Sequence, residues 1–233
     1  MSDQVFDAVI IGGGNKGLIM GMYLARYGGM SVGIFERRHE AGGGWTTEEG
    51  AAPGFLSDCH ATSVGYVYHL TTQQDFPEWR ELGGELSNPR VAEAGIFKED
   101  GSTVLIYNPR FDPDCELTAK SIANLSQRDA ETWVKYFDLY NKVWVPYFLE
   151  WIHTPPPPPG EPDAMDKMVA DPRACIEPGW PYMTPQEVLR DLFENDAFIA
   201  FLQKGVFSAL ATPSDQPGMG LAVLLWALGL PYT

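Results

Sequence analysis

The sequence predicts an α/β fold, and three observations near the N-terminus support this prediction. Residues 6–11 (FDAVII) are typical of a buried strand, because three β-branched residues stand together at its end. Glycines follow at once, and residues 17–29 then have the pattern of a helix that ends at Gly28 and Gly29. Residues 30–36 (MSVGIFE) form a second predicted strand. This order predicts two neighbouring parallel strands joined by a helix.

The turn after the first predicted strand has glycines at positions 12, 14 and 17, with the spacing G-x-G-x-x-G. Gly12 permits a tight turn, Gly14 lets backbone N–H groups approach a pyrophosphate, and Gly17 lets the helix pack close to the strand. The partial positive charge of the helix N-terminus suits phosphate groups. Glu36 lies 19 residues after Gly17 and can accept hydrogen bonds from ribose hydroxyls. The sequence therefore predicts a dinucleotide-binding turn rather than a plain flexible loop.

The overall composition limits the class of protein. The chain has 233 residues, with 16 Lys and Arg against 31 Asp and Glu, and its formal net charge is −15. So acidic a surface argues against nucleic-acid binding and allows at most peripheral contact with an anionic membrane. The longest apolar run, residues 219–230, is shorter than the roughly 20 residues that a membrane-spanning helix needs. We expect it to be a buried helix.

Cysteine and histidine usage indicates neither a disulfide framework nor a metal site. Cys59, Cys115 and Cys175 are far apart and form no C-x-x-C pair, and the four histidines show no metal-ligand spacing. The N-terminal residues have no basic segment or cleavage site typical of a signal peptide. We therefore expect a cytoplasmic location, where thiols stay reduced.

A second glycine turn, Gly42–Gly43, lies six residues after Glu36 and is followed by Thr46 and Thr47. With this pattern the sequence resembles flavoproteins of the glutathione-reductase type, in the branch of the phytoene desaturases and amine oxidases. The stretches DAVIIGGG, ERR, GG, TEE before PGF, and LSQRDAETW are most similar to bacterial phytoene-dehydrogenase-like proteins. The similarity is dense over residues 5–65 and faint over 185–230. The resemblance implies that the chain corresponds to the N-terminal half of such an enzyme.

The resemblance implies FAD as the cofactor, with the second glycine turn running along its pyrophosphate towards the flavin. The cofactor-binding residues that it implies are Gly12, Gly14, Asn15, Gly17, Glu36, Arg37, Gly43, Gly44, Trp45 and Thr46. The sequence departs from the common pattern at Gly44, where many relatives carry an arginine that reaches a phosphate, and at Trp45. Lys16 either adds a positive charge near the phosphates or points into solvent, and we favour solvent.

His60 is the candidate catalytic residue. The resemblance places residues 55–66 near the flavin ring, and imidazole exchanges protons near neutral pH. Two alternatives remain: a histidine hydrogen-bonded in the core, and one that contacts FAD without taking part in chemistry.

The sequence predicts two domains, the N-terminal part of an FAD-binding domain over residues 1–70 and an α+β substrate-domain part over 71–233. Residues 94–107 predict a β-hairpin, because Asp100–Gly101 is a common turn pair between apolar runs. Residues 125–152 predict a long helix that is kinked or split at Pro146, and Ser126, with Asp129 three residues later, is its predicted N-cap.

Six aromatic residues recur along this helix at three- and four-residue steps and predict one aromatic face. They are Trp133, Phe137, Tyr140, Trp144, Phe148 and Trp151. We expect the face to pack into the core, with the alternative that part of it lines a pocket for an apolar substrate.

The C-terminal third begins with a proline-rich connector, residues 154–163, whose five consecutive prolines span about 15 Å. Thr184 and Glu187 predict a capping box at the start of a helix over residues 183–193. Residues 196–211 and 219–229 predict two further helices.

The predicted sheet is incomplete, because a nucleotide-binding sheet has about five or six strands and residues 1–70 provide two. Two parallel strands cannot bury both faces of a sheet. We therefore expect a second polypeptide, separately encoded or produced by cleavage, to complete the sheet and the flavin site. The alternative is that the sequence is a truncated piece.

The first functional hypothesis is a subunit or fragment of an FAD-dependent dehydrogenase or desaturase that acts on an apolar, terpenoid or carotenoid-like substrate by hydride transfer. The second hypothesis is a flavin-dependent oxidase of the amine-oxidase branch. A lipid-binding escort protein of the same fold without flavin is a third hypothesis, and a nicotinamide-only dehydrogenase is a weaker fourth.

Overall fold

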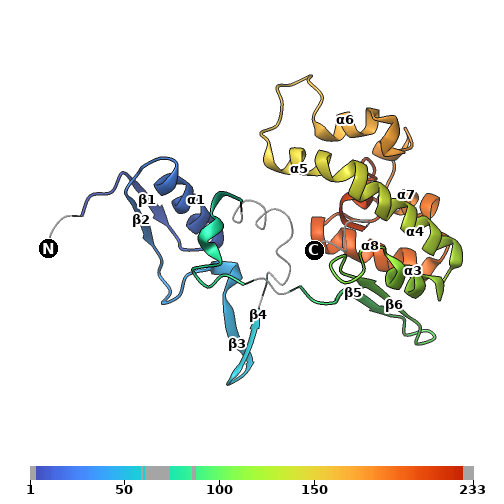
Figure 1. Ribbon diagram of the computed structural model, residues 1–233, viewed down its shortest axis with the longest axis horizontal. Helices are drawn as coiled ribbons and strands as arrows, with labels where there is room; N and C mark the ends of the chain where they lie inside the picture. The colour runs from blue at the N-terminus through green and yellow to red at the C-terminus, as the bar shows by residue number, and fades with distance from the viewer. Residues whose placement is uncertain (1–3, 59, 61–73, 86–87, 228–233) are drawn as a thin grey trace. The chain divides into compact units, whose positions relative to one another are not determined.

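The computed structural model describes residues 4–58, 60, 74–85 and 88–227, and it divides into two compact units, Met1–Val64 and Gly65–Thr233 (Figure 1). The domain boundary expected at residue 70 lies outside the described residues and stays a prediction. No helix among the described residues combines the length and the apolar character that a membrane crossing requires.

The N-terminal unit opens with the predicted strand, helix and strand. They are β1 (Ala8–Ile11), α1 (Asn15–Arg26) and β2 (Val32–Phe35). The strands run parallel, with Ala8 opposite Val32 and Ile11 opposite Phe35, which confirms the predicted topology. Helix α1 packs closely on one face of this sheet at Gly21, where an added Cβ would lie 2.8 Å from Cδ1 of Ile34.

A β-hairpin follows β2 in the same unit and was not expected from the sequence. Strands β3 (Thr47–Ala52) and β4 (Phe55–Asp58) pair antiparallel. Gly54 turns the chain between them at a φ of 82°, a conformation that favours glycine. Pro53–Gly54 is a turn signal that identifies this hairpin in retrospect.

The second unit confirms the hairpin predicted over residues 94–107, as the antiparallel strands β5 (Val91–Ile96) and β6 (Thr103–Tyr107). Helix α3 (Glu116–Ala123) covers the outer edge of β6. Hydroxyl groups of this helix accept hydrogen bonds from the strand: Leu105 N donates to Ser121 Oγ at 2.8 Å and Tyr107 N donates to Thr118 Oγ1 at 3.0 Å. The edge is therefore protected against pairing with another strand.

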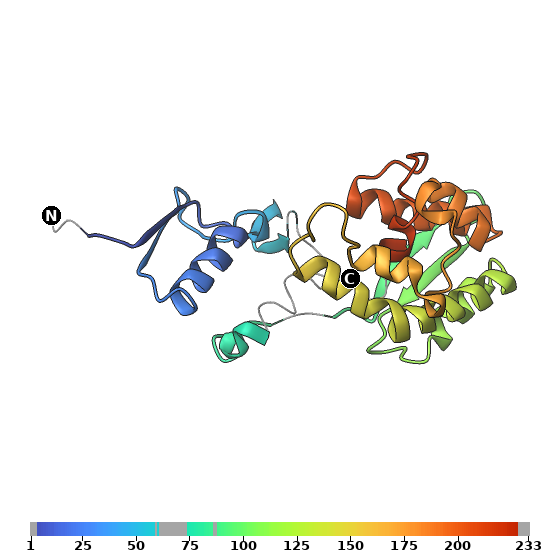
Figure 2. The same cartoon turned by 90° about the horizontal axis from the view of Figure 1, so that it is seen from above.

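Helices form most of the described part of this unit after the hairpin (Figure 2). The predicted long helix is split before Pro146, because a π-helical turn, Tyr140–Trp144, separates α4 from α5. The helices after α3 are α4 (Gln127–Leu139), α5 (Val145–His153), α6 (Ala164–Ala170), α7 (Pro185–Leu192) and α8 (Asp196–Leu210). The helix expected over residues 219–229 is, in its described part, a π-helical turn at Val223–Ala227.

The aromatic face of α4 and α5 is mainly core, as expected. Trp133, Tyr140, Trp144 and Phe148 are fully buried. The indole of Trp144 donates its Nε1–H to the carbonyl of Ala174 at 2.9 Å, which satisfies its one polar atom. This part of the face therefore holds the helices together and is not open to a ligand.

The predicted helix starts are confirmed at two positions. Ser126 Oγ accepts a hydrogen bond from Asp129 N at 3.1 Å, and Thr184 forms the capping box with Glu187. The buried carboxylate of Asp129 accepts hydrogen bonds from Glu194 N at 2.8 Å and from Asn195 N at 2.9 Å. It thereby joins α4 to the start of α8.

Candidate functional site

The first glycine turn connects β1 to α1 and has the shape that its spacing predicts. Gly12 has a φ of 103°, and its N–H donates to the Phe35 carbonyl at 2.8 Å. A Cβ at Gly17 would meet the carbonyl oxygen of Gly12, so the helix approaches the turn at a distance that only glycine allows. At Gly14 the nearest atom to an added Cβ is Gly43 Cα, 3.9 Å away. The space above Gly14 is therefore open on the side away from the second glycine turn.

The N-terminus of α1 presents hydrogen-bond donors. Among the hydrogen bonds of the described residues, none is made by the backbone N–H groups of Gly14, Lys16 or Gly17. The N-cap residue Gly14 has no side chain to satisfy them, and the first turn of the helix carries no acidic residue. These donors and the helix dipole together suit a phosphate group.

Glu36 follows β2 and lies beside this turn. Its Oε2 accepts from Gly13 N at 2.7 Å and its Oε1 accepts from Arg38 N at 2.9 Å. These bonds from the amides of Arg38 and Gly13 lower the pKa of the Glu36 carboxyl, so the group is ionised at neutral pH. Each carboxylate oxygen has a second lone pair that can accept from a ribose hydroxyl.

The second glycine turn lies directly against the first. Gly42 N donates to Gly13 O at 2.7 Å, and Asn15 N donates to Gly42 O at 3.2 Å. A Cβ at Gly43 would lie 2.9 Å from Gly14 Cα, so the two backbones approach more closely than other residues permit. Gly42 and Gly43 also have positive φ angles, of 124° and 62°. The structure therefore brings the two glycine turns into one site.

The residues after the second turn differ in their surroundings. Thr46 is buried, and its hydroxyl lies 2.9 Å from Gly43 O and 3.1 Å from Glu48 Oε1. Gly44 has open space around the position of a Cβ, and Trp45 is 37% exposed. Arg37 and Lys16 are exposed, and solvent exposure is what we favoured for Lys16.

His60 is exposed and stands between undescribed residues, Cys59 and the segment 61–73. It lies near enough to Glu48 to contribute to the lowered pKa of that carboxyl, after the larger effects of Arg38 and Thr46. The segment that would carry it towards a flavin lies outside the described residues. The catalytic role of His60 stays a prediction.

Two residues beside the glycine turns, Arg38 and Glu48, were not predicted from the sequence, which predicted Arg37 as a site residue. Arg38 Nη2 donates to Glu48 Oε1 at 2.7 Å and to Glu40 Oε1 at 3.1 Å. The double arginine after Glu36 was the available signal. Which arginine turns towards β3 depends on a residue ten positions away, and the pattern does not reveal this.

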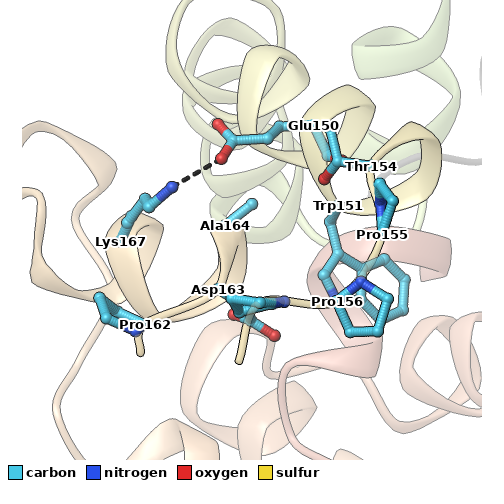
Figure 3. Close-up of a pocket in the computed structure, with 10 residues that line it drawn as sticks. Glu150, Trp151, Thr154, Pro155, Pro156, Pro162, Asp163, Ala164 and Lys167 are labelled. Carbon is cyan, nitrogen blue, oxygen red and sulfur yellow. Dashed lines mark hydrogen bonds and ion pairs between the residues drawn. The ribbon is translucent and has the colours of Figure 1, made fainter. Parts of the chain in front are cut away.

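A small pocket lies at the far end of the aromatic face. A cavity of about 160 Å³ is bounded by Trp151 of α5, the prolines after it and the start of α6 (Figure 3). Lys167 Nζ and Glu150 Oε1 form an ion pair of 2.7 Å beside it. Its size is below that of drug-sized ligand pockets, which begin at about 300 Å³. In the part of the chain that the structure describes, no three His, Cys, Asp or Glu side chains gather as a metal site.

Comparison with known proteins agrees with this geometry. Residues 10–86 match the model of a family described as the NAD(P)-binding Rossmann-like domain. The fold is Rossmann-like α/β. Wild-type putrescine oxidase bound to putrescine aligns with a TM-score of 0.52 at 19% identity, over 97% of this chain and 43% of that chain. This likeness concerns the fold alone.

Two curated relatives are similar in sequence over about three fifths of this chain. A limonene dehydrogenase subunit from Castellaniella defragrans is 37% identical over 148 residues, which cover 61% of this chain and 24% of that protein. Pyridine nucleotide-disulfide oxidoreductase domain-containing protein 2 of Rattus norvegicus is 29% identical over 146 residues, covering 59% and 23%. The chain thus matches about a quarter of the length of these relatives.

Proposed function

We propose that the N-terminal unit binds FAD, with the diphosphate over the two glycine turns and the adenosine ribose on Glu36. The single observation that supports this most is the contact of Gly43 with Gly14. This contact lies beside the amides of Gly14, Lys16 and Gly17, which make no hydrogen bond among those of the described residues. A nicotinamide dinucleotide needs only the first turn. The second turn has a role only for a cofactor that continues along it, as FAD does in the family that the sequence resembles.

The residues of this chain would act by binding and orientation. The amides of Gly14, Lys16 and Gly17 would donate to the phosphate oxygens, and Glu36 would accept from the ribose. Thr46 and the backbone of Gly43 and Gly44 would support the part of the cofactor nearer the flavin. When bound, the flavin supplies the acceptor for a hydride from the substrate. His60 stays the proposed proton-exchanging residue.

We propose that the assembled protein is a dehydrogenase or desaturase of an apolar, terpenoid-like molecule. The support is the similarity to a limonene dehydrogenase subunit and the resemblance to phytoene-dehydrogenase-like proteins. A flavin-dependent oxidase of the amine-oxidase branch is the second candidate, because the glycine turns resemble that branch as well. We keep a cytoplasmic location as part of this proposal, on the basis of the scattered cysteines.

We further propose that another stretch of polypeptide, a partner or the remainder of a longer chain, completes the sheet. Val9, Ile11 and Phe35 share the face of β1 and β2 opposite α1, and they are 56%, 83% and 54% exposed. Among the described residues of the N-terminal unit, no helix covers this face. Parallel sheets are normally covered on both sides, so an added strand and its covering layer would bury these side chains. The similarity to a protein named as a subunit supports a partner.

The cofactor assignment is tested by purifying the protein with whatever polypeptide accompanies it, and identifying the bound cofactor by absorbance and by mass after denaturation. We expect FAD. A colourless protein that takes up no FAD in excess supports the escort protein instead. Uptake of NAD without FAD supports the nicotinamide dehydrogenase.

The substrate class is tested on the flavin-loaded protein without oxygen. Limonene, as a representative terpene, should bleach the flavin absorbance, and putrescine should not. Bleaching by putrescine alone would overturn the dehydrogenase assignment in favour of the amine oxidase.

A further inference from the structure

Arg38 is connected at both ends to the candidate dinucleotide site. Its backbone N–H donates to Glu36 Oε1 at 2.9 Å, and its guanidinium lies 2.7 Å from Glu48 Oε1 on β3. A second carboxylate, that of Glu40, lies 3.1 Å from the same nitrogen. The guanidinium is therefore held between two carboxylates.

Glu48 extends this connection to the second glycine turn. Its Oε1 also accepts from the hydroxyl of Thr46 at 3.1 Å, and the single proton of that hydroxyl is shared with Gly43 O at 2.9 Å. Thr46 is buried, so this part of the connection is shielded from water. A continuous series of hydrogen bonds thus runs from the Gly13 amide through Glu36, Arg38, Glu48 and Thr46.

Both charges of the pair persist over a wide pH range. Hydrogen bonds from Arg38 and Thr46 lower the pKa of the Glu48 carboxyl, and Glu48 raises the pKa of Arg38. The neighbouring Arg37 is exposed and makes no ion pair among those found in the described residues. The two adjacent arginines therefore have different surroundings.

We propose that the Arg38–Glu48 pair is a positioning device that holds the second glycine turn against the first, and that Arg38 is not a phosphate ligand. The second turn then lies against the first before a dinucleotide arrives, which lowers the cost of ordering the turn on binding. The proposal rests on the proposed function for the identity of the ligand, but the bracing of the turn does not depend on it. Arg38 and Glu48 act through Thr46 and Gly43 and touch no ligand themselves.

The experiment compares Arg38→Gln, Glu48→Gln and the double variant with the unaltered protein, and Arg26→Gln, at an exposed arginine in the last turn of α1, serves as the control. FAD affinity is measured by titration of the flavin-depleted protein. We expect each single variant to weaken FAD binding about fivefold, near the upper range for an exposed ion pair. The double variant should bind FAD no more weakly than either single variant, because each single substitution already removes the Arg38–Glu48 pair. Arg26→Gln should change the affinity less than twofold, and Arg38→Lys should restore part of the loss.

A second readout needs no flavin. Trp45 N and Thr46 N donate to the carbonyls of Gly42 and Gly43, and their hydrogen exchange reports whether the turn is closed. Exchange at these amides in the cofactor-free protein should be faster in Arg38→Gln and Glu48→Gln and unchanged in Arg26→Gln.

Three results overturn the proposal. If Arg38 binds a phosphate, Arg38→Gln weakens FAD binding while Glu48→Gln leaves it unchanged or tightens it. If only the net positive charge of the N-terminal unit matters, Arg26→Gln weakens binding as much as Arg38→Gln. If the turn does not need the pair, hydrogen exchange at Trp45 and Thr46 is the same in all variants. An unaltered protein that binds no FAD contradicts the proposed function, and the exchange measurement still decides the role of the pair.

Discussion

The Glu36 carboxylate accepts a hydrogen bond from the Gly13 amide, with Oε2 and N 2.7 Å apart. The acid after the second strand therefore braces the first glycine turn before any ribose is present. A Cβ at Gly13 would lie 3.1 Å from Cβ of Glu36, so the two residues fit against each other. Glu36 thus has two roles in this account, one in the shape of the turn and one in the proposed contact with the sugar.

These two roles predict the effect of replacing Glu36. Glu36→Ala removes the partner of the Gly13 amide and the proposed ribose acceptor, so FAD binding should weaken by about tenfold or more. Glu36→Gln keeps one acceptor oxygen and should weaken binding less. Titration of the flavin-depleted protein with FAD measures both. Equal affinity in Glu36→Ala and the unaltered protein would exclude the ribose contact.

Acid should destabilise the N-terminal unit through Glu36 and Glu48. Their pKa values are lowered in the folded chain relative to about 4.5, chiefly by the amides of Arg38 and Gly13 for Glu36 and by Arg38 and Thr46 for Glu48. A lowered acid pKa contributes stability that is present above the unfolded value and is lost as pH falls through the folded value. The free energy of unfolding should therefore decrease as pH falls below about 4.5, and this decrease should be smaller in Glu36→Gln than in the unaltered protein. A double variant, Glu36→Gln with Glu48→Gln, should lose least, and an unchanged pH profile would contradict this.

Gly14 should be required for cofactor binding and not for folding. Its backbone has a φ of −71° and a ψ of 167°, which other residues adopt without strain, and an added Cβ meets only Gly43 Cα at 3.9 Å. Gly14→Ala should leave the melting temperature nearly unchanged and weaken FAD binding by about tenfold, and Gly14→Val should weaken it further.

The control for Gly14 is Gly179→Ala in the second unit. The nearest atom to its added Cβ is Met183 Sδ at 3.8 Å, so the packing change is similar. This variant should keep full FAD affinity. Normal flavin content in Gly14→Val would show that the phosphates do not pass over this turn.

Asp129 should be important for the stability of the second unit. Its carboxylate has no exposed surface and accepts from the amides of Glu194 and Asn195. Asp129→Ala leaves two amides without this acceptor and should lower the free energy of unfolding by roughly 2–4 kcal/mol. Denaturation by urea, followed by tryptophan fluorescence, measures the change.

Asp138→Ala is the matched control for Asp129→Ala. Asp138 lies on the same helix, and its carboxylate is exposed and pairs with Lys142. Exposed pairs of this kind contribute little, so the unfolding midpoint should hardly move. Similar losses in the two variants would show that the buried hydrogen bonds of Asp129 are not what stabilises the junction of α4 and α8.

The open face of β1 and β2 should mediate assembly. Ile11 is 83% exposed, so Ile11→Asp costs the isolated chain little. In the assembled protein the same change would bury a charge, and the partner polypeptide should be lost on gel filtration. Lys16→Asp, at another exposed position of the N-terminal unit, should leave the assembly intact. Unchanged assembly of Ile11→Asp would remove this face from the interface.

Local signals in the sequence predicted much of the fold. The β-branched run before Gly12, the turn pair Asp100–Gly101 and the caps at Ser126 and Thr184 each act within a few residues, and the structure confirms these elements. Pro146 also marked the division of the long helix. Such signals report on backbone geometry near their own position, and this is why they can be found without tertiary contacts.

Features that depend on distant residues escaped prediction. Asp129 resembled the third residue of a capping box, but its carboxylate bonds to amides 65 and 66 positions away. The pairing of Arg38 depends on where β3 places Glu48, and no pattern near Glu36 reveals this. The contact of Gly43 with Gly14 follows from the folding of the second turn onto the first. Spacing alone contains none of this information.

The most direct measurement is an experimental structure of the protein with FAD bound, together with any polypeptide that completes the sheet. We expect the diphosphate to lie within hydrogen-bond distance of the amides of Gly14, Lys16 and Gly17, and a ribose hydroxyl to donate to the Glu36 carboxylate. A structure in which FAD lies elsewhere, and these three amides face solvent, would contradict this expectation.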